Sequence, residues 1–318
     1  MQRITDKMRK RAEELIAEGK AVRFLGWEKG SFWWQSPPVE IKEASQTGRL
    51  NWDLFCTANL AKYLQQMQSA EGKTGVFVKG CDARGINRLL RDGAIDRDKT
   101  YLVGIPCPGM IDPDKVRSLV GDGEVTITQT EEGLSLQGPL GSRKVALDEV
   151  ALDKCLTCRH PEPVIYDELL EGAAREAFTG DPYEEARELE DLGSDERYDY
   201  WAKELSRCIR CYACRNVCPA CNCIQCVFDM DRPNWLDGAT NLSNNQVYQM
   251  IRFMHVAGRC IDCGECERAC PMGIPLRKLA AKVDKDVNEL FGPFEAGLDP
   301  EEKLPLGTFD PNDPDSFE

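Results

Sequence analysis

Histidine is scarce in this chain: two of its 318 residues are His. No Ser/His/Asp constellation and no metal-hydrolase pattern can be assembled from the residues, and neither a G-x-G-x-x-G loop nor a P-loop is present. The sequence therefore offers no obvious catalytic constellation of its own and no loop for binding phosphate.

Long apolar runs and an excess of positive charge are also missing. No apolar run approaches the length of a membrane span, and the N-terminal segment is charged and amphipathic, without the apolar centre of a signal peptide. The net charge of −14 argues against binding of nucleic acid, which needs a basic face. We therefore expect a cytoplasmic protein with no membrane span and no nucleic-acid partner.

Cysteine, in contrast, is abundant, with 16 residues. In a reducing cytoplasm, thiols are expected to serve as ligands rather than to form disulfides. Two runs share the spacing C-x2-C-x2-C-x3-C-P, one beginning at Cys208 and the other at Cys260. This spacing is the one that holds iron–sulfur clusters in bacterial two-cluster ferredoxins, whereas zinc sites normally use two C-x2-C pairs.

The spacing also predicts which thiols share a cluster. Three thiolates two residues apart on a tight loop can each reach a separate iron of one cubane, and the fourth Cys of the run points at the other cluster. We therefore expect two [4Fe-4S] clusters that exchange ligands between the runs. The first is assigned to Cys208, Cys211, Cys214 and Cys270, and the second to Cys260, Cys263, Cys266 and Cys218.

Before the cysteine runs, the sequence alternates between strand and helix patterns. Residues 76–78 and 101–105 each read as a buried strand that is followed by a loop and a helix. This alternation predicts an α/β domain with a small, mainly parallel sheet, whose sites lie at the carboxyl ends of the strands. The segments after residue 124 read as short strands that cover this sheet, and residues 52–66 and 163–178 read as helices.

Composition divides the chain into two domains. We expect the α/β domain over residues 1–180, an acidic linker over 181–196 and a mainly α-helical two-cluster ferredoxin domain over 197–291. The acidic segment is typical of a solvated linker or an exposed helix. Residues 292–318 are rich in proline and acids, so they are expected to form an extended tail that is disordered or wraps a partner.

Some of the cysteines outside the two runs suggest a third cluster. Cys81 and Cys107 lie in equivalent loops after neighbouring strands and should be close in space, and Cys155 and Cys158 form a C-x2-C pair. We expect these four thiolates to bind a third [4Fe-4S] cluster, with Cys56 as the substitute ligand.

A last group of cysteines follows the first run directly. Cys221, Cys223 and Cys226 are spaced too densely for packing residues. With one distant thiolate, such as that of Cys56, they could hold a fourth cluster or a zinc ion. The number of clusters expected from the sequence is therefore two, with a third or fourth depending on these leftover thiols.

Two parts of the sequence resemble a known family. Residues 75–109, from GVFVKGCDARGINRLL to YLVGIPCPGM, are similar to the beta-subunit family of the deazaflavin-reducing hydrogenases and related formate dehydrogenases, and KCLTCRHPEPVIYDELL continues the likeness. Residues 207–275 are similar to ferredoxin modules attached to that family and to the C subunit of heterodisulfide reductase. Here the ferredoxin module follows the first domain, whereas in the simplest members it precedes it.

The resemblance implies an iron–sulfur electron-transfer subunit of an anaerobic complex. Such a subunit docks on a catalytic partner of the formate dehydrogenase, hydrogenase or heterodisulfide-reductase type and relays electrons to another carrier. Members that reduce the deazaflavin also bind FAD in the first domain. The alternative is therefore an FAD-containing oxidoreductase subunit that exchanges hydride with a deazaflavin or nicotinamide coenzyme, although no residue of this sequence marks an FAD site.

Overall fold

The computed structural model describes residues 1–69, 71–130 and 133–307. The chain forms two compact units, one of residues 1–83 with 95–179 and the other of residues 84–94 with 180–318. Helix α3 (Gly80–Arg91) gives its first turn to the first unit and the rest of its length to the second. Among the described residues, no helix is long and apolar enough to cross a membrane.

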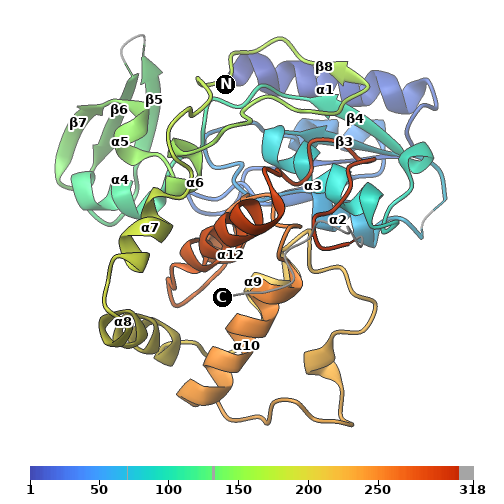
Figure 1. The fold of residues 1–318 in the computed structure, drawn as a ribbon. Coiled ribbons are helices and arrows are strands. Elements are labelled where there is room, and N and C mark those ends of the chain that lie inside the picture. Colours follow the sequence, from blue (N-terminus) through green and yellow to red (C-terminus); the bar gives the residue numbers. More distant parts are fainter. Residues whose placement is uncertain (70, 131–132, 308–318) are drawn as a thin grey trace. The chain divides into compact units, whose positions relative to one another are not determined.

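The first unit is built on a five-stranded sheet with the strand order β2-β1-β3-β4-β8. Strand β3 is buried along its whole length, as strands covered on both faces are. The expected α/β class with a mainly parallel sheet is confirmed (Figure 1). The parallel strands are β1 (Arg23–Trp27), β3 (Thr74–Val78), β4 (Thr100–Gly104) and β8 (Glu168–Leu169), and the antiparallel edge strand is β2 (Pro38–Ile41).

Helix α1 (Gln2–Ala17) shows why an amphipathic segment folds onto this sheet. Its residues Met8 and Leu15 recur on one face and are fully buried. On another side of the helix, Arg11 forms an ion pair at 2.8 Å with Glu168 of β8, which lies next to α1 in Figure 1. Apolar burial and this pair together hold the helix against the sheet.

The prediction of a helix over residues 52–66 is wrong for its first half, because α2 spans only Ala61–Gln66. The Asp53 carboxylate accepts the Phe55 N–H at 2.8 Å, and the Asn59 side chain accepts the Ala61 N–H at 3.0 Å. Such side-chain bonds satisfy backbone donors locally and compete with helix formation.

The prediction of a helix over residues 163–178 is also wrong. The segment contains the short strand β8, which pairs with β4 at the edge of the sheet. The rest of the segment is irregular. The Asp167 carboxylate accepts a bond from Arg97 at 2.7 Å and another from the Leu102 N–H at 2.7 Å. Strand β4 has backbone N–H and C=O groups that need hydrogen-bond partners, and pairing with them outweighs the local helix propensity of this segment.

A separate antiparallel sheet holds β5 (Thr126–Thr130), β6 (Gly133–Gly138) and β7 (Gly141–Val145). These strands do not cover the parallel sheet as expected. Their apolar side chains pack with those of α4 (Pro113–Val120) and α5 (Leu147–Val150), beside which they lie in Figure 1. The second sheet thus has its own small core.

The second unit is mainly helical, as expected. Its helices surround a core to which six cysteines of the two runs contribute, either as buried or as partly buried residues. The helices are α7 (Glu184–Glu190), α8 (Ser194–Ser206), α9 (Ala213–Asn216), α10 (Leu242–His255), α11 (Glu265–Arg268) and α12 (Leu276–Phe291).

Part of the acidic segment is the helix α7, whose charges have partners. Glu190 pairs with Lys282 at 2.7 Å and with Lys285 at 3.0 Å, both on α12. Ala186 of the same helix is buried. The acidic run therefore serves in part to pack α7 against α12 and is not only a solvated connection.

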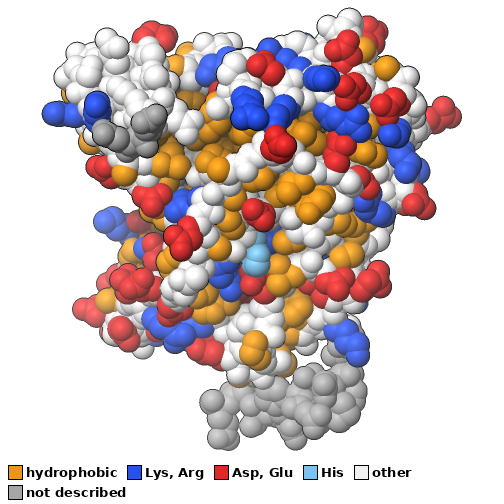
Figure 2. Space-filling model, turned by 90° about the horizontal axis from the view of Figure 1, so that it is seen from above, with side chains coloured by type: hydrophobic (Ala, Val, Ile, Leu, Met, Phe, Trp, Pro, Cys, Tyr) orange, Lys and Arg blue, Asp and Glu red, His pale blue; other side chains and the backbone are white. Residues whose placement is uncertain are grey.

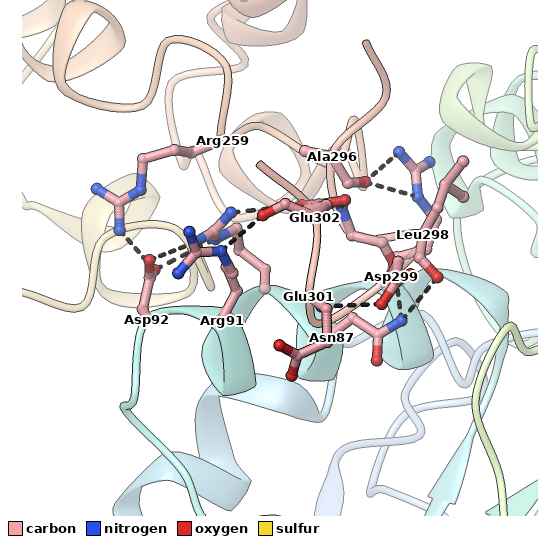
Figure 3. Close-up of polar contacts among 12 residues, drawn as sticks. Asn87, Arg91, Asp92, Arg259, Ala296, Leu298, Asp299, Glu301 and Glu302 are labelled. Carbon is pink, nitrogen blue, oxygen red and sulfur yellow. Dashed lines mark hydrogen bonds and ion pairs between the residues drawn. The ribbon is translucent and has the colours of Figure 1, made fainter. Parts of the chain in front are cut away.

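The C-terminal segment, as far as residue 307, packs on the part of α3 that belongs to the second unit (Figure 3). Arg84 donates to the carbonyl oxygen of Ala296 at 2.8 Å, and Asn87 donates to that of Leu298 at 3.1 Å. The described part of the expected tail is thus bonded to its own chain. Residues 308–318 lie outside the described residues.

The charged side chains are mixed on the face shown in Figure 2. There, the Lys and Arg side chains of the described residues alternate with Asp and Glu and form no continuous basic surface. Binding to a nucleic-acid backbone requires such a surface. The absence of a nucleic-acid partner stays a prediction from charge.

Candidate metal centres

The two cysteine runs fold into loops of the same shape. In the first run Arg210 and Tyr212 have φ angles of 47° and 60°, and at the matching places of the second run Asp262 and Gly264 have 51° and 65°. Left-handed residues placed in this way turn successive N–H groups to one side and form a concavity that suits anionic groups, iron–sulfur clusters included. Three of the four residues are not glycine, and such strain persists at functional sites where the surroundings hold it.

One cavity is lined by four cysteines, of which three come from the first run and one from the second. Its volume is about 300 Å³, part of it open to solvent, and apolar residues such as Ile274 and Leu276 complete the wall. The four thiol-bearing residues are Cys208, Cys211, Cys214 and Cys270.

A second cavity is lined by three cysteines of the second run and one of the first. It has a volume of about 420 Å³, again partly open to solvent, and its other lining residues include Arg252, Phe253 and Ile261. The four cysteines that line it are Cys218, Cys260, Cys263 and Cys266. The structure therefore brings together the same two sets of four thiols that the spacing predicts.

The thiols of these cavities have shifted pKa values. Burial raises the pKa of Cys208, and the thiols of Cys214 and Cys270 raise it further. Burial likewise raises the pKa of Cys266 to about 12, although the positive charge of Arg252 opposes this. Neighbouring thiols cannot all ionise without a cation among them, and a bound metal deprotonates its thiol ligands outright. The donor sets thus fit an iron–sulfur cluster.

Helix α10 supplies further groups that face the first cavity. Gln249 donates from Nε2 towards Sγ of Cys208 at 3.7 Å, and the Tyr248 hydroxyl lies 3.7 Å from Sγ of Cys214. Hydrogen bonds to ligand sulfur tune the reduction potential of a cluster. These residues were not predicted from the sequence, although the buried polar positions of α10 recur at helical spacing.

The structure also places the first-unit thiols near one another. Cys107 follows β4, and burial raises the pKa of its thiol, as do the thiols of Cys155 and Cys81. Burial raises the pKa of Cys81 to about 12, and Cys158 contributes to that shift. The position of Cys81 corrects one expectation: it lies in the first turn of α3 and not in a loop, because the Asp82 carboxylate accepts the Lys79 N–H at 2.9 Å and starts the helix early.

Cys56 has a different environment from these four cysteines. It is fully buried, and its Sγ lies 3.4 Å from the Asp53 N–H and 3.6 Å from the carbonyl oxygen of Asn51, within its own loop. Burial raises its pKa, and the charge of Asp53 raises it further. The groups that contact its sulfur are therefore those of a packed, protonated thiol.

Known proteins resemble this chain both in part and over most of its length. Residues 204–274 match the 4Fe-4S dicluster domain family. The beta subunit of an F420-dependent formate dehydrogenase from Methanocaldococcus jannaschii is 24% identical over 86% of this chain and 87% of its own length. Its counterpart in formate dehydrogenase 1 of Methanococcus maripaludis is 22% identical over 92% of this chain and 90% of its own. The chain is thus similar to formate dehydrogenase beta subunits over most of its length.

The resemblance seen in the sequence is thereby confirmed, and the chain contains a 4Fe-4S dicluster domain. Among solved structures, a chain of the F420-reducing [NiFe] hydrogenase complex from Methanosarcina barkeri covers 48% of this chain and 58% of its own. It is 15% identical and its TM-score is 0.39, so the match carries no argument about the fold.

The remaining thiols of the second unit follow the first run. Cys223 is exposed, whereas Cys221 and Cys226 are half-buried. A hydrogen bond from Cys221 lowers the pKa of Cys218 to about 5 against the effect of burial. Asn222 donates to Asp92 at 2.7 Å within the second unit.

Within the described ranges, no three Cys, His, Asp or Glu side chains converge closely enough to hold a single metal ion. This is compatible with cubane sites, because each thiolate of a cubane binds a different iron and the sulfurs stand further apart than around one ion. A zinc ion held by Cys221, Cys223 and Cys226 requires the closer arrangement. The further cluster or zinc at this trio stays a prediction.

Proposed function

We propose that this chain is an iron–sulfur electron-transfer subunit of a redox complex of the formate dehydrogenase or hydrogenase type. The observation that supports the proposal is the pair of cavities, each lined by four cysteines drawn from both runs. One cluster is held by Cys208, Cys211, Cys214 and Cys270, and the other by Cys260, Cys263, Cys266 and Cys218. When bound, the clusters carry the electrons, and the chain supplies ligands, burial and hydrogen bonds.

The exchange of ligands between the runs favours a relay. Cys214 lies in the short helix α9 and Cys218 lies four residues further along the chain, yet the two line different cavities. Two clusters held in this way are neighbours, and an electron accepted by one can pass to the other. The chain would relay electrons between a catalytic subunit and another carrier, and its relatives are named as subunits of a redox enzyme, formate dehydrogenase.

A third cluster belongs to the same proposal. The thiol of Cys158 raises the pKa of Cys81, and the thiols of Cys155 and Cys81 raise the pKa of Cys107, so these four residues of the first unit lie near one another. Of the four, Cys81 follows β3 and Cys107 follows β4, at the carboxyl ends of parallel strands where α/β proteins place their sites. They would hold a [4Fe-4S] cluster outside the dicluster domain.

The composition of the anaerobically purified protein tests the proposal. We expect about twelve irons and as many labile sulfides per chain, since each cubane has about four of each. Iron and sulfide assays, together with reduction by dithionite followed by EPR spectroscopy, measure this. Protein that contains no iron–sulfur cluster after reconstitution would contradict the proposal.

The third cluster has a test of its own. Cys107→Ser should lower the iron content by about four per chain and leave the EPR signals of the dicluster domain unchanged. Cys56→Ser is the matched control, because Cys56 is also buried in the first unit but bonds within its own loop. An iron content of Cys107→Ser equal to that of the wild type would exclude the assignment of Cys107.

The names of the relatives favour one alternative function. Both are subunits of F420-dependent formate dehydrogenases, and F420 is a deazaflavin. In that case the first unit binds FAD and exchanges hydride with the coenzyme, and the clusters then take single electrons. The same purified protein decides between the two: one flavin per chain supports the alternative, and its absence after reconstitution counts against it.

A further inference from the structure

A buried arginine contacts residues of both cavities of the dicluster domain. Arg252 of α10 is 3% exposed and lines the cavity of Cys218 and Cys260. Its Nη2 donates at 2.9 Å to the carbonyl oxygen of Cys214, which lines the other cavity. One side chain therefore reaches residues of both candidate clusters.

Two hydrogen-bond donors of the Arg252 guanidinium are unsatisfied within the part of the chain that the structure describes. Its Nε and Nη1 are buried and have no acceptor among the described residues. Leaving a buried donor unpaired costs about 1–3 kcal/mol, and more for a charged group. Burial lowers the pKa of Arg252, but the thiols of Cys266, Cys218 and Cys214 outweigh this and raise it. The cavity that Arg252 lines also holds the thiols of Cys218, Cys260, Cys263 and Cys266, and its guanidinium lies over the Phe253 ring, 4.5 Å from the centroid.

The other arginine of the same cavity differs in this respect. Arg277 is held by Asp262, with both guanidinium-to-carboxylate contacts at 2.6 Å. A carboxylate this close largely cancels its charge towards the cavity. Arg252 bonds a neutral carbonyl oxygen, so its charge stays available to an anionic cluster.

We propose that Arg252 donates its spare N–H groups to the sulfur of the clusters and thereby raises their reduction potentials. The inference rests on the proposed function, because it needs both clusters to be present. An external donor loses one electron, one cluster gains it, and no proton moves. The reduced cluster carries one more negative charge, which a buried cation and its N–H donors stabilise. Both clusters become easier to reduce than they would be without Arg252.

Redox titration of the full chain, followed by EPR spectroscopy, tests this role. In Arg252→Gln the ratio of reduced to oxidised cluster at a fixed solution potential should fall at least tenfold, which is 59 mV for a one-electron couple. Arg252→Lys keeps the charge but not the planar fork of donors, so a smaller shift in the same direction is expected.

Arg207→Gln is the matched control for the loss of an arginine charge. Arg207 bonds to the carbonyl oxygen of Met272 at 2.9 Å, two residues after Cys270, but its side chain is 41% exposed. Water and salt screen this exposed charge, and the Glu204 carboxylate pairs with it, so the cluster potentials of this variant should equal those of the wild type. A shift as large as that of Arg252→Gln would show that any nearby arginine acts equally and would overturn the proposal.

The outcomes separate this inference from the proposed function. Wild-type protein without clusters would refute the proposed function, whereas unchanged potentials in an Arg252→Gln variant with full iron content would refute only the role of Arg252. If Arg252→Gln loses iron, its potentials cannot be compared with those of the wild type. Pulsed EPR of the reduced wild type labelled with nitrogen-15 arginine then tests whether Arg252 bonds to the clusters. Hyperfine coupling to arginine nitrogen that disappears in Arg252→Lys supports the proposal, and a spectrum without such coupling overturns it.

Discussion

Replacing Cys211 and Cys263 together by serine should abolish the electron transfer of the dicluster domain. Each residue lines one of the two four-cysteine cavities, so each cubane loses one thiolate. A serine hydroxyl stays protonated near neutral pH and is a poor ligand for iron. We expect the iron content to fall by about eight per chain and the EPR signals of both clusters to disappear on reduction with dithionite.

The fold of the first unit should survive this double substitution. Cys211 is exposed and Cys263 is half-buried, and neither belongs to the first unit, so little packing there depends on them. Cys223→Ser is the matched control, because Cys223 is an exposed thiol of the same unit that lines neither cavity. If the double variant keeps its irons and its rate of reduction, the ligand assignment is wrong.

Gly80→Ala should cause the largest structural loss in the first unit. A Cβ atom at Gly80 would lie 1.8 Å from the carbonyl oxygen of His160 and 2.9 Å from that of Glu162. Both are backbone atoms that cannot rotate away, so the start of α3 and the segment after Cys158 must separate. Cys81 and Cys158 lie on either side of this contact, and we expect the third cluster to be lost with it.

The sign of this effect distinguishes it from ordinary helix propensity. In a helix, alanine is normally favoured over glycine by about 1 kcal/mol, whereas here we expect destabilisation of about 3 kcal/mol or more from overpacking. Thermal unfolding and iron content measure the two consequences. Gly48→Ala is the control, because no atom lies within 4 Å of its Cβ position. Equal stability of both variants would mean that the close backbone approach at Gly80 does not exist in solution.

Local patterns in the sequence were sufficient to predict features that depend on residues close together in the chain. The spacing within each run determines which thiols one loop can present, and the matching left-handed residues at Arg210 and Asp262 follow from that loop shape. The alternation of strands and helices was likewise enough to predict a mainly parallel sheet. These inferences use neighbours within a few residues, where distance along the chain and distance in space nearly coincide.

The two failed helix predictions concern segments whose backbone groups bond to partners other than those of a helix. Residues 163–178 read as a helix but complete the edge of the sheet, because β4 offers unpaired backbone groups there. Residues 52–60 read as a helix but are held by side-chain bonds of Asp53 and Asn59. In each case, hydrogen bonds that hydrophobic periodicity does not encode outweigh a modest local propensity.

By itself, the sequence determined that this protein has eight thiols spaced for two cubanes, an α/β region before them and helices around them. Only the tertiary structure decided that α3 is divided between two units and that the Cys56 thiol bonds within its own loop. It also decided that Arg252 is buried between two sets of cysteines. The physical reason is that ligand spacing is a property of one loop, whereas burial and charge compensation arise only where separate segments meet.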